Sequence, residues 1–485
     1  MPARTGLRPG PLVGLACALL IARGAGAQPA AGYNVLFVVV DDLRPELGAY
    51  GVEYVHTPRI DGLAARAVVF ERAYAQAPIC SPSRMSFLTG LRVGGTGIRV
   101  NNLPLRAVRP ELVTLPQRFR ETGYQATAQG KVFHGGTGDS LSWDRYDDGP
   151  KNRSVYQLPK NLAINDVADG SRRGRPYEAS RVPDSVLTDG QIAGRAIRDL
   201  EALAPDRPFF LAVGMLKPHL PFIAPRAYWD LYPPSGLTLY ERTRERPAGA
   251  PAFAFTDAGE VRRYGTVPRE GPLPSALEDS LARGYAAAVS YMDAQVGLVL
   301  DALEASGRAD STIVVLFGDQ GFKLGDLGGW AKDTPYELDA RVPLLVAVPG
   351  VAPGRSAAVV ELVDLYPTLL ELTGVAAPTS HALSGESLVP ELLTPTAEPV
   401  DTAYAFTELL RGGRLGLAVR DGRYRLVEWR DAGEPERLLE RELYDYVADG
   451  GVERVNRAGR PALADVEARL ARAIACELDA RRYRG

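Results

Sequence analysis

Continuous apolar runs recur along most of the chain, and segments with helical spacing separate them. Such runs, rich in β-branched residues, are typical of strands that are buried on both faces of a parallel sheet. The expected strands cover residues 34–40, 124–129, 208–215, 312–317 and 343–348. The strand at 124–129 is less apolar than the other four. Helices are expected at residues 57–63, 82–90, 114–122, 183–203, 275–305 and 362–372. This alternation predicts an α/β fold with a mostly parallel central sheet.

Two long segments lack this periodicity. Residues 136–182 are polar, with scattered Gly, Ser, Asp and Arg, and residues 221–275 are rich in Pro and Arg. Long irregular segments of a compact domain are often binding loops. We therefore expect both segments to be surface insertions that shape a ligand pocket.

The pattern changes near residue 380. A strong β-hairpin signal surrounds the turn Asp421-Gly422, and an amphipathic helix follows at residues 463–478. These features predict an α/β domain over residues 28–384 and a small α+β subdomain with an antiparallel sheet over residues 385–485.

The N-terminus has the pattern of an export signal. Arg4 and Arg8 precede a short apolar run at residues 12–21. Ala25-Gly26-Ala27 then suits cleavage by a signal peptidase. The run is too short to span a bilayer, and a disordered tail is the alternative. We predict that residues 1–27 are a signal peptide, and that the protein is exported, periplasmic or extracellular, with no membrane attachment after cleavage.

The composition excludes several classes of protein. Of the 485 residues, 46% are hydrophobic and 24% are charged, and 56 basic against 59 acidic residues leave a net charge of −3. These values argue against a disordered chain, a coiled coil or a polytopic membrane protein. No basic excess indicates a nucleic-acid partner, and none is expected. Lysines, histidines and cysteines are few, so each one at a site-like position carries extra weight.

Polar residues follow four of the predicted strands. Asp41 and Asp42 follow the first strand, and Asp319 and Gln320 follow the strand at 312–317. Ligands bind beyond the carboxyl ends of the strands in open α/β sheets, and oxygen ligands favour calcium or magnesium. The sequence thus predicts a hard-cation site, with a simple turn cap at the two aspartates as the alternative. The other two strands are followed by Lys131, His134, Lys217 and His219.

Cys80 precedes an expected helix and lies four residues before Arg84. A lone cysteine is usually an inert buried residue, but an electropositive setting of this kind can activate a thiol. The direct interpretation is therefore a thiol nucleophile, whose usual partners would be a histidine base and an Asn or Asp that orients it.

The segment Cys80-Ser81-Pro82-Ser83-Arg84, with Leu88-Thr89-Gly90 after it, resembles the signature of the sulfatase family. Further blocks resemble the same family, several of them its iduronate-2-sulfatase branch. They are NVLFVVVDDLRPELGAY (34–50), GKVFH (130–134), KPHLPF (217–222), WAK (330–332) and ELYD (442–445), with Asn456 beyond. Together these blocks extend along most of the chain and are far more specific than a single C-x-P-S-R.

The resemblance implies an alkaline-phosphatase-like α/β core over residues 28–384 and a set of site residues. Cys80 would be oxidised to formylglycine by the formylglycine-generating enzyme during maturation. One Ca²⁺ would be held by Asp41, Asp42, Asp319 and Gln320, with residue 80 in its shell. Arg84 and Lys131 would steady the aldehyde hydrate, and His134 would be the base. His219 and Lys332 would bind sulfate, and one of them would protonate the leaving alcohol.

The implied chemistry has two steps. One hydroxyl of the aldehyde hydrate attacks sulfur and expels the alcohol. The other hydroxyl then loses its proton to His134, the carbonyl reforms, and sulfate leaves by C–O cleavage. A calcium ion and several fixed cations offset the charge of the sulfate monoester anion.

Three positions qualify this expectation. Gln320 stands where the family usually has Asn or His, and Leu327 replaces a His of the family. Lys323 is expected to be a solvated surface lysine, with a contact to the substrate as the alternative. We expect a sulfuric ester hydrolase that acts on a sulfated sugar or polysaccharide fragment, with a 2-O-sulfated uronate as the candidate that the branch implies. Two alternatives stay open: a phosphodiester or phosphonate monoester hydrolase on the same fold, and a non-catalytic carbohydrate-binding relative in which Cys80 is not converted.

Overall fold

The computed structural model describes residues 32–149, 156–165, 173–232, 243–255, 259–398 and 403–482. The predicted signal peptide, residues 1–27, lies outside these ranges, so its removal and the export of the protein stay predictions. The division into domains at residues 384 and 385 also stays a prediction.

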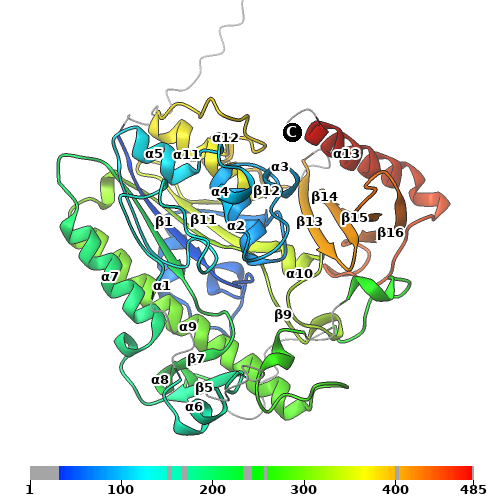
Figure 1. Cartoon of the computed structure of the whole chain (residues 1–485), viewed down its shortest axis with the longest axis horizontal. Helices are drawn as coiled ribbons and strands as arrows, with labels where there is room; N and C mark the ends of the chain where they lie inside the picture. Colours follow the sequence, from blue (N-terminus) through cyan, green and yellow to red (C-terminus); the bar gives the residue numbers. More distant parts are fainter. Residues whose placement is uncertain are drawn as a thin grey trace, which may run out of the picture.

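An eight-stranded sheet crosses the middle of the molecule in the order β12-β2-β11-β8-β1-β6-β3-β4 (Figure 1). Its strands are β1 (Asn34–Val40), β2 (Val68–Tyr74), β3 (Gln125–Gly130), β4 (Arg145–Asp147), β6 (Phe209–Met215), β8 (Thr312–Gly318), β11 (Arg341–Ala347) and β12 (Gly354–Glu361). All neighbouring pairs are parallel except those of β11, which runs antiparallel to β2 and β8. The predicted mostly parallel sheet is therefore confirmed.

Helices cover both faces of this sheet, which explains why its central strands are apolar throughout. Alternate residues of β1 enter two separate cores: Val35 and Phe37 lie in one, and Leu36 and Val38 in the other. The first core is closed by α2 (Cys80–Thr89), α5 (Leu115–Glu121), α11 (Leu365–Thr373) and α12 (Val389–Leu393). The second core is closed by α1 (Pro58–Ala64), α7 (Thr188–Ala202) and α9 (Ser275–Ala305).

Helix α9 is the one helix of the described ranges that is long and apolar enough to cross a membrane. In its most apolar window, 78% of the helix is buried inside the protein. Val289, Met292 and Val296 on this helix pack in the second core. Its apolar character is thus explained by core packing.

A second sheet, β13-β14-β15-β16, is antiparallel throughout and lies beside the main sheet (Figure 1). It consists of β13 (Ala405–Arg411), β14 (Arg414–Arg420), β15 (Tyr424–Asp431) and β16 (Leu438–Asp445). One face packs on α13 (Ala464–Arg482). The other face, with Val427 and Trp429, packs against Leu327 and Tyr336 of the α/β part.

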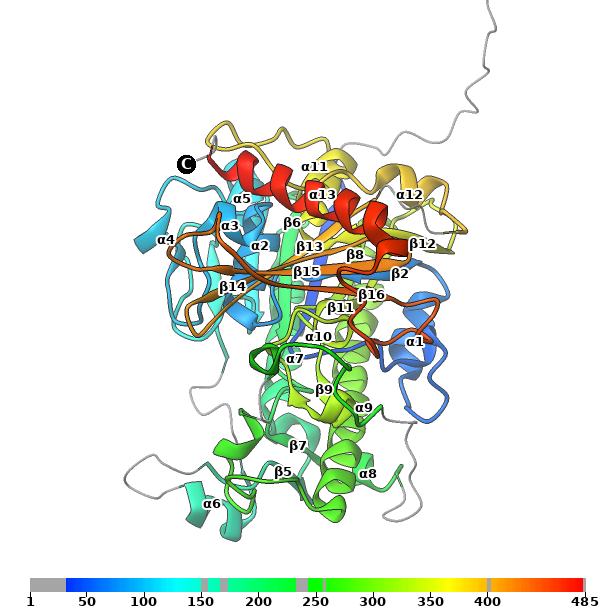
Figure 2. The ribbon, with the colours of Figure 1, turned by 90° about the vertical axis from the view of Figure 1, so that its right-hand side faces the viewer.

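Short elements complete the fold. The short helices are α3 (Val93–Thr96), α4 (Leu105–Val108), α6 (Pro159–Asn165), α8 (Arg226–Trp229) and α10 (Glu337–Ala340). Two further sheets have two strands each: β5 (Tyr177–Ser180) pairs with β7 (Phe222–Pro225), and β9 (Lys323–Leu324) pairs with β10 (Trp330–Ala331). Single 3₁₀ turns are Gly48–Tyr50, Asp184–Val186, Ala252–Ala254, Val261–Arg263, Ala309–Ser311, Asp326–Gly328, Leu362–Asp364 and Pro461–Leu463. Figure 2 shows β5, β7, α6 and α8 gathered at the end of the molecule away from α13.

Several boundaries differ from the sequence predictions. Helix α2 begins at Cys80 rather than after Pro82, because proline fits within the first turn of a helix. Strands β2 and β12 are not among the strands expected from the sequence, since Glu71 and Arg72 interrupt the apolar run of β2, and β12 has only four apolar residues in sequence, 357–360. Part of the predicted insertion at 136–182 is not a surface loop, because it supplies the edge strand β4.

Candidate active site

The carboxyl ends of neighbouring strands bring the predicted residues to one edge of the sheet. In β1, Val40 pairs with Gly318 of β8 on one side and with Met215 of β6 on the other. Asp41 and Asp319 follow these paired positions, so the register places their carboxylates next to each other. The peptide N–H of Asp42 donates to Oδ1 of Asp319 over 3.0 Å, which joins the two strand ends.

Two glycines let β3 and β6 end against each other and so place Lys131. Gly130 has a φ of +77°, and a Cβ built there would lie 2.3 Å from the carbonyl oxygen of Gly214. A Cβ on Gly214 would lie 2.1 Å from the carbonyl carbon of Lys131. Both positions therefore require glycine, and the chain after β3 turns directly into the site.

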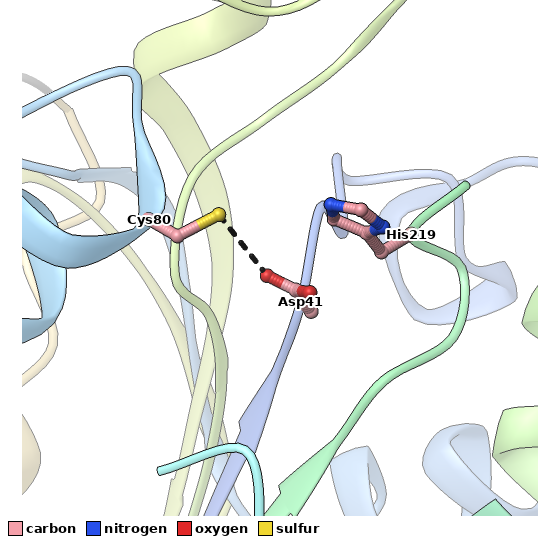
Figure 3. A group of neighbouring side chains, drawn as sticks. All are labelled: Asp41, Cys80 and His219. Atoms are coloured by element: carbon pink, nitrogen blue, oxygen red, sulfur yellow. Dashed lines mark hydrogen bonds between the residues drawn. The ribbon is translucent and has the colours of Figure 1, made fainter. Parts of the chain in front are cut away.

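Cys80 is the first residue of α2 and its side chain is buried at the same edge. Its Sγ lies 3.4 Å from Oδ1 of Asp41. Figure 3 shows this contact, with His219 on the other side of that carboxylate. Nitrogen atoms of three other predicted residues surround the sulfur, at 3.3 Å for Lys332, 3.5 Å for Lys131 and 3.5 Å for Gln320. One atom of residue 80 thus contacts the acidic and the basic halves of the site.

Arg84 lies one helical turn after Cys80 and is fully buried. Its Nε donates to Oδ2 of Asp319 over 2.9 Å, and its terminal nitrogen lies 3.2 Å from Oδ1 of Asp41. It also donates to the backbone carbonyls of Lys131 and Val132. This guanidinium therefore fixes both strand-end carboxylates and the segment after β3.

The thiol of Cys80 is not activated in this structure. Burial, with the neighbouring Asp41 carboxylate, raises the pKa of Cys80 to about 12, against the opposing effect of Lys131 and Lys332. This direction opposes the interpretation of Cys80 as a thiolate activated by its electropositive surroundings, because a protonated, buried thiol is a poor nucleophile.

The buried carboxylates fit the predicted hard-cation site. Oxygens of Asp41, Asp42 and Asp319 lie within 4.8 Å of one another. Oδ2 of Asp42 and Oε1 of Gln320 are buried and have no hydrogen-bond partner in the part of the chain that the structure describes. The three carboxylates offer only oxygens, which suits Ca²⁺ or Mg²⁺, and the amide of Gln320 presents its Nε2, which donates to Oδ1 of Asp42.

The electrostatics of these carboxylates agree with a missing positive charge. Burial raises the pKa of Asp42 well above its ordinary value although Lys332 opposes it, and it raises that of Asp319 to about 6 although Arg84 opposes it. For Asp41 burial acts the same way, but Lys131 and then His219 hold its pKa well below the ordinary value. The cations of the chain therefore do not fully compensate the cluster, and a divalent ion would.

His134 and His219 both line the site. Burial, helped by Lys131, lowers the pKa of His134 to about 3, and its buried Nδ1 has no partner within the described ranges. A neutral imidazole with an open nitrogen is able to accept a proton. Burial likewise lowers the pKa of His219 to about 3, against Asp41, and its Nδ1 faces the carbonyl of Leu220.

Lys217 supports the loop that carries His219. Its ammonium group donates to the backbone carbonyls of His219 and, over 2.7 Å, Pro221. Its peptide N–H donates to Asp189 over 2.8 Å. Lys217 thus holds the loop that carries His219.

Sequence reasoning missed Glu260, which lies beside two predicted residues. Its carboxylate is 3.4 Å from Nε2 of His219 and 3.9 Å from Nζ of Lys332. A single glutamate in a polar segment matches no motif. The available signal was its place in 221–275, the segment expected to shape the pocket.

One expectation about the segment after β8 needs correction. Lys323 is not a solvated surface residue: it is 1% exposed and bonds to Asp339 and Thr334. Leu327 is buried with Tyr336 and Trp429 against the second sheet. The apolar side chain at position 327 therefore belongs to the contact between the two sheets.

Comparisons with known proteins agree with this site. A family model described as "Sulfatase" matches residues 33–375, and one described as "N-sulphoglucosamine sulphohydrolase, C-terminal" matches residues 325–479. The iduronate 2-sulfatase of Mus musculus is 35% identical over 409 residues, which cover 76% of this chain and 73% of that protein. The chain belongs to the sulfatase family. It is a sulfuric ester hydrolase.

Solved structures show the same fold. The phosphonate monoester hydrolase of Silicibacter pomeroyi is similar with a TM-score of 0.74 at 23% identity, over 93% of this chain and 96% of that chain. BT4656, solved with its substrate D-glucosamine-2-N,6-O-disulfate, has a TM-score of 0.72 at 21% identity, over 93% and 98% of the two chains. The alkaline-phosphatase-like fold is therefore confirmed.

Proposed function

We propose that this sulfatase removes sulfate from a sulfated carbohydrate with a formylglycine at position 80 as its nucleophile. The proposal rests on the contacts of Cys80, whose sulfur lies within 3.5 Å of Asp41, Lys131 and Lys332. A thiol with a pKa near 12 is protonated and carries no charge for these cations to stabilise. An aldehyde hydrate would use them, because both of its hydroxyls need fixed partners.

The residues of the chain have separate tasks in this proposal. Arg84 and Lys131 hold the hydrate in place, and the open Nδ1 of His134 accepts the proton that leaves in the second step. His219 and Lys332 bind sulfate oxygens, and one of them protonates the leaving alcohol. Preorganised donors in a buried site stabilise developing charge more strongly than water does.

One Ca²⁺ is the metal that we propose for the acidic cluster. Asp41, Asp42 and Asp319 would hold it, together with Gln320 and residue 80. When bound, the ion neutralises the carboxylates and draws electron density from the sulfate group. The orphan oxygens of Asp42 and Gln320 are the structural support for this assignment.

We propose a glycosaminoglycan-type sulfated sugar as substrate, with a 2-O-sulfated uronate as the specific candidate. The support is the similarity to proteins named iduronate 2-sulfatase and to a structure named as a 2-O GAG sulfatase. The maturation enzyme that converts Cys80 and the export of the chain belong to the same proposal.

The decisive test is the chemical state of residue 80 together with sulfate release. Protein from a host with the converting enzyme should show the aldehyde by mass spectrometry of the peptide that spans residue 80, and it should hydrolyse an aryl sulfate faster than the matching phosphate or phosphonate ester. Cys80→Ala should fold and lose turnover by at least about 10³-fold, as for removal of a nucleophile.

Two results would contradict the proposal. An intact thiol in a protein that still releases sulfate would remove the formylglycine, and a preference for the phosphonate ester would change the reaction class. Cys476→Ala is the matched control, because Cys476 is an exposed free cysteine on α13 and should leave turnover unchanged.

A further inference from the structure

Glu260 is placed on the outer side of the site. The exposed fraction of the side chains rises from 0% for Asp42 to 6% for Lys332 and 17% for both His219 and Glu260. Because Glu260 and His219 are more exposed than Asp42 and Lys332, a sulfate ester bound by His219 and Lys332 would extend towards solvent past Glu260.

Glu260 carries a negative charge in this position. Burial raises the pKa of its carboxyl group, but Lys332 and His219 outweigh burial and hold the pKa at about 2. Glu260 is outside the all-aspartate group of Asp41, Asp42 and Asp319 that we assign to the metal, although its carboxylate also lies within 4.8 Å of ligand atoms of Asp42 and His219. The carboxylate of Glu260 repels a sulfate ester, so its presence beside the sulfate-binding residues needs an explanation.

A hydrogen bond from a hydroxyl group of the substrate would offset this repulsion. A carboxylate only accepts hydrogen bonds, and it binds a hydroxyl donor more strongly than a neutral acceptor does. Glu260 contacts both residues that we assign to sulfate binding, His219 at 3.4 Å and Lys332 at 3.9 Å. The group closest to a sulfate ester in a sugar is the hydroxyl on the neighbouring carbon.

We propose that Glu260 is a specificity-determining residue that accepts a hydrogen bond from a free hydroxyl next to the sulfate ester and rejects substrates with an anionic group at that carbon. This inference rests on the proposed function, because it needs a sulfate ester between His219 and Lys332. Within the sulfated sugars of the proposed function, the enzyme would act on a monosulfate with a free hydroxyl on the adjacent carbon and would reject a vicinal disulfate.

The alternative role of Glu260 is to position His219 and Lys332. A positioning role affects every sulfate ester to the same extent, because both residues act on the sulfate itself. A specificity role changes the ratio between esters that differ only at the adjacent carbon. The ratio of kcat/KM values therefore separates the two roles.

The experiment compares three synthetic esters: methyl iduronoside 2-sulfate, its 3-deoxy analogue and its 2,3-disulfate. Wild-type protein should prefer the first over the second by at least about tenfold, the size expected for a hydrogen bond to a charged group. Glu260→Gln should reduce this preference to about threefold or less, and it should raise the rate on the disulfate relative to the monosulfate by about tenfold.

Glu270→Gln is the matched control, because Glu270 is an exposed glutamate of the same segment, and it should keep the wild-type ratios. Hydrolysis of 4-nitrophenyl sulfate, which has no adjacent hydroxyl, and the thermal unfolding midpoint report whether Glu260→Gln is folded. If it is not, Glu260→Asp, which withdraws the carboxylate by one methylene, takes its place and should also reduce the preference.

An equal loss of kcat/KM on all three esters would overturn the inference and leave Glu260 as a positioning residue. A wild-type enzyme without preference for the free hydroxyl would overturn it as well. Failure of the wild type on every sulfate ester, 4-nitrophenyl sulfate included, would instead overturn the proposed function itself. The two failures are therefore distinguishable.

Discussion

Residue 319 shows how one side chain binds three other residues. Asp319 accepts from Arg84 and from the peptide N–H groups of Asp42 and Gln320, and burial raises its pKa to about 6. This carboxylate is held by the chain and is still under-compensated. A bound divalent ion would stabilise the folded state, because a ligand that binds only the native protein adds to its free energy of unfolding.

We predict that Ca²⁺ raises the thermal unfolding midpoint of the wild-type protein and that Asp319→Asn loses this increment. At a free Ca²⁺ concentration of 100 times its Kd the gain in the free energy of unfolding is about 2.7 kcal/mol. The measurement is a thermal melt with and without EDTA. Asp279→Asn, at an exposed position of α9, is the control that should keep the full increment. An equal Ca²⁺ response of both variants would argue against the assigned ligands.

Residues also mark the limit of prediction from sequence. Asp41, Cys80, Lys131 and Lys332 belong to short blocks that could be recognised from the sequence, and the structure brings them together. Glu260 could not be found in this way, because its contact with His219 depends on the path of a long irregular segment. Polar loops leave no periodic signal from which such a path follows.

Elements differ in how clearly the sequence marks them. Strands β1, β6 and β8 are buried along their whole length, so their apolar runs define them. Strand β2 contains two half-buried charged residues in its middle, which break the run although the backbone pairs on both sides. A strand can therefore be recognised from its sequence when both of its faces are buried.

The close end of β3 against β6 leads to a prediction at the scale of elements. Gly130→Ala places a Cβ 2.3 Å from the carbonyl oxygen of Gly214 and also puts alanine in the left-handed region. We expect a loss of about 1–2 kcal/mol for the backbone conformation and a further loss of about 1–3 kcal/mol for overpacking. The shift of the urea midpoint at constant m value measures both.

Gly136→Ala separates these two contributions. Gly136 has a similar φ of +75°, but no atom lies within 4 Å of a Cβ there. It should show the backbone cost alone, about 1–2 kcal/mol. Equal losses for the two variants would mean that the β3–β6 contact relaxes without cost.

At the scale of the whole molecule, Glu337 joins the two sheets. Its carboxylate accepts from Tyr74 of β2 over 3.0 Å and from Arg425 of β15 over 2.8 Å, and it lies 3.3 Å from Arg420 of β14. Although burial raises its pKa, these arginines lower it from 4.5 to about 2. One side chain of α10 thus binds the central sheet and the second sheet at once.

The lowered pKa of Glu337 predicts a pH dependence of stability. The folded state favours the ionised carboxyl, so its contribution is fully present above pH 4.5 and is lost as the pH falls towards 2. The wild type should exceed Glu337→Gln in free energy of unfolding by about 3 kcal/mol at neutral pH, and the difference should shrink across that window. Urea unfolding at several pH values measures it.

Glu440→Gln provides the control for this prediction. Glu440 is an exposed residue of β16 in the same sheet, and its substitution should leave the pH profile of stability unchanged. A wild-type advantage over Glu337→Gln that is independent of pH would show that packing, rather than the ionised carboxylate, connects the sheets.

The burial of Cys80 has a consequence for the history of each molecule. The thiol is 1% exposed, and every residue of α2 around it is buried. Under the proposed function, an enzyme that converts this cysteine would have to reach it before the chain folds, because the thiol is out of reach in the folded protein. A chain that folds before the conversion would keep an unmodified Cys80.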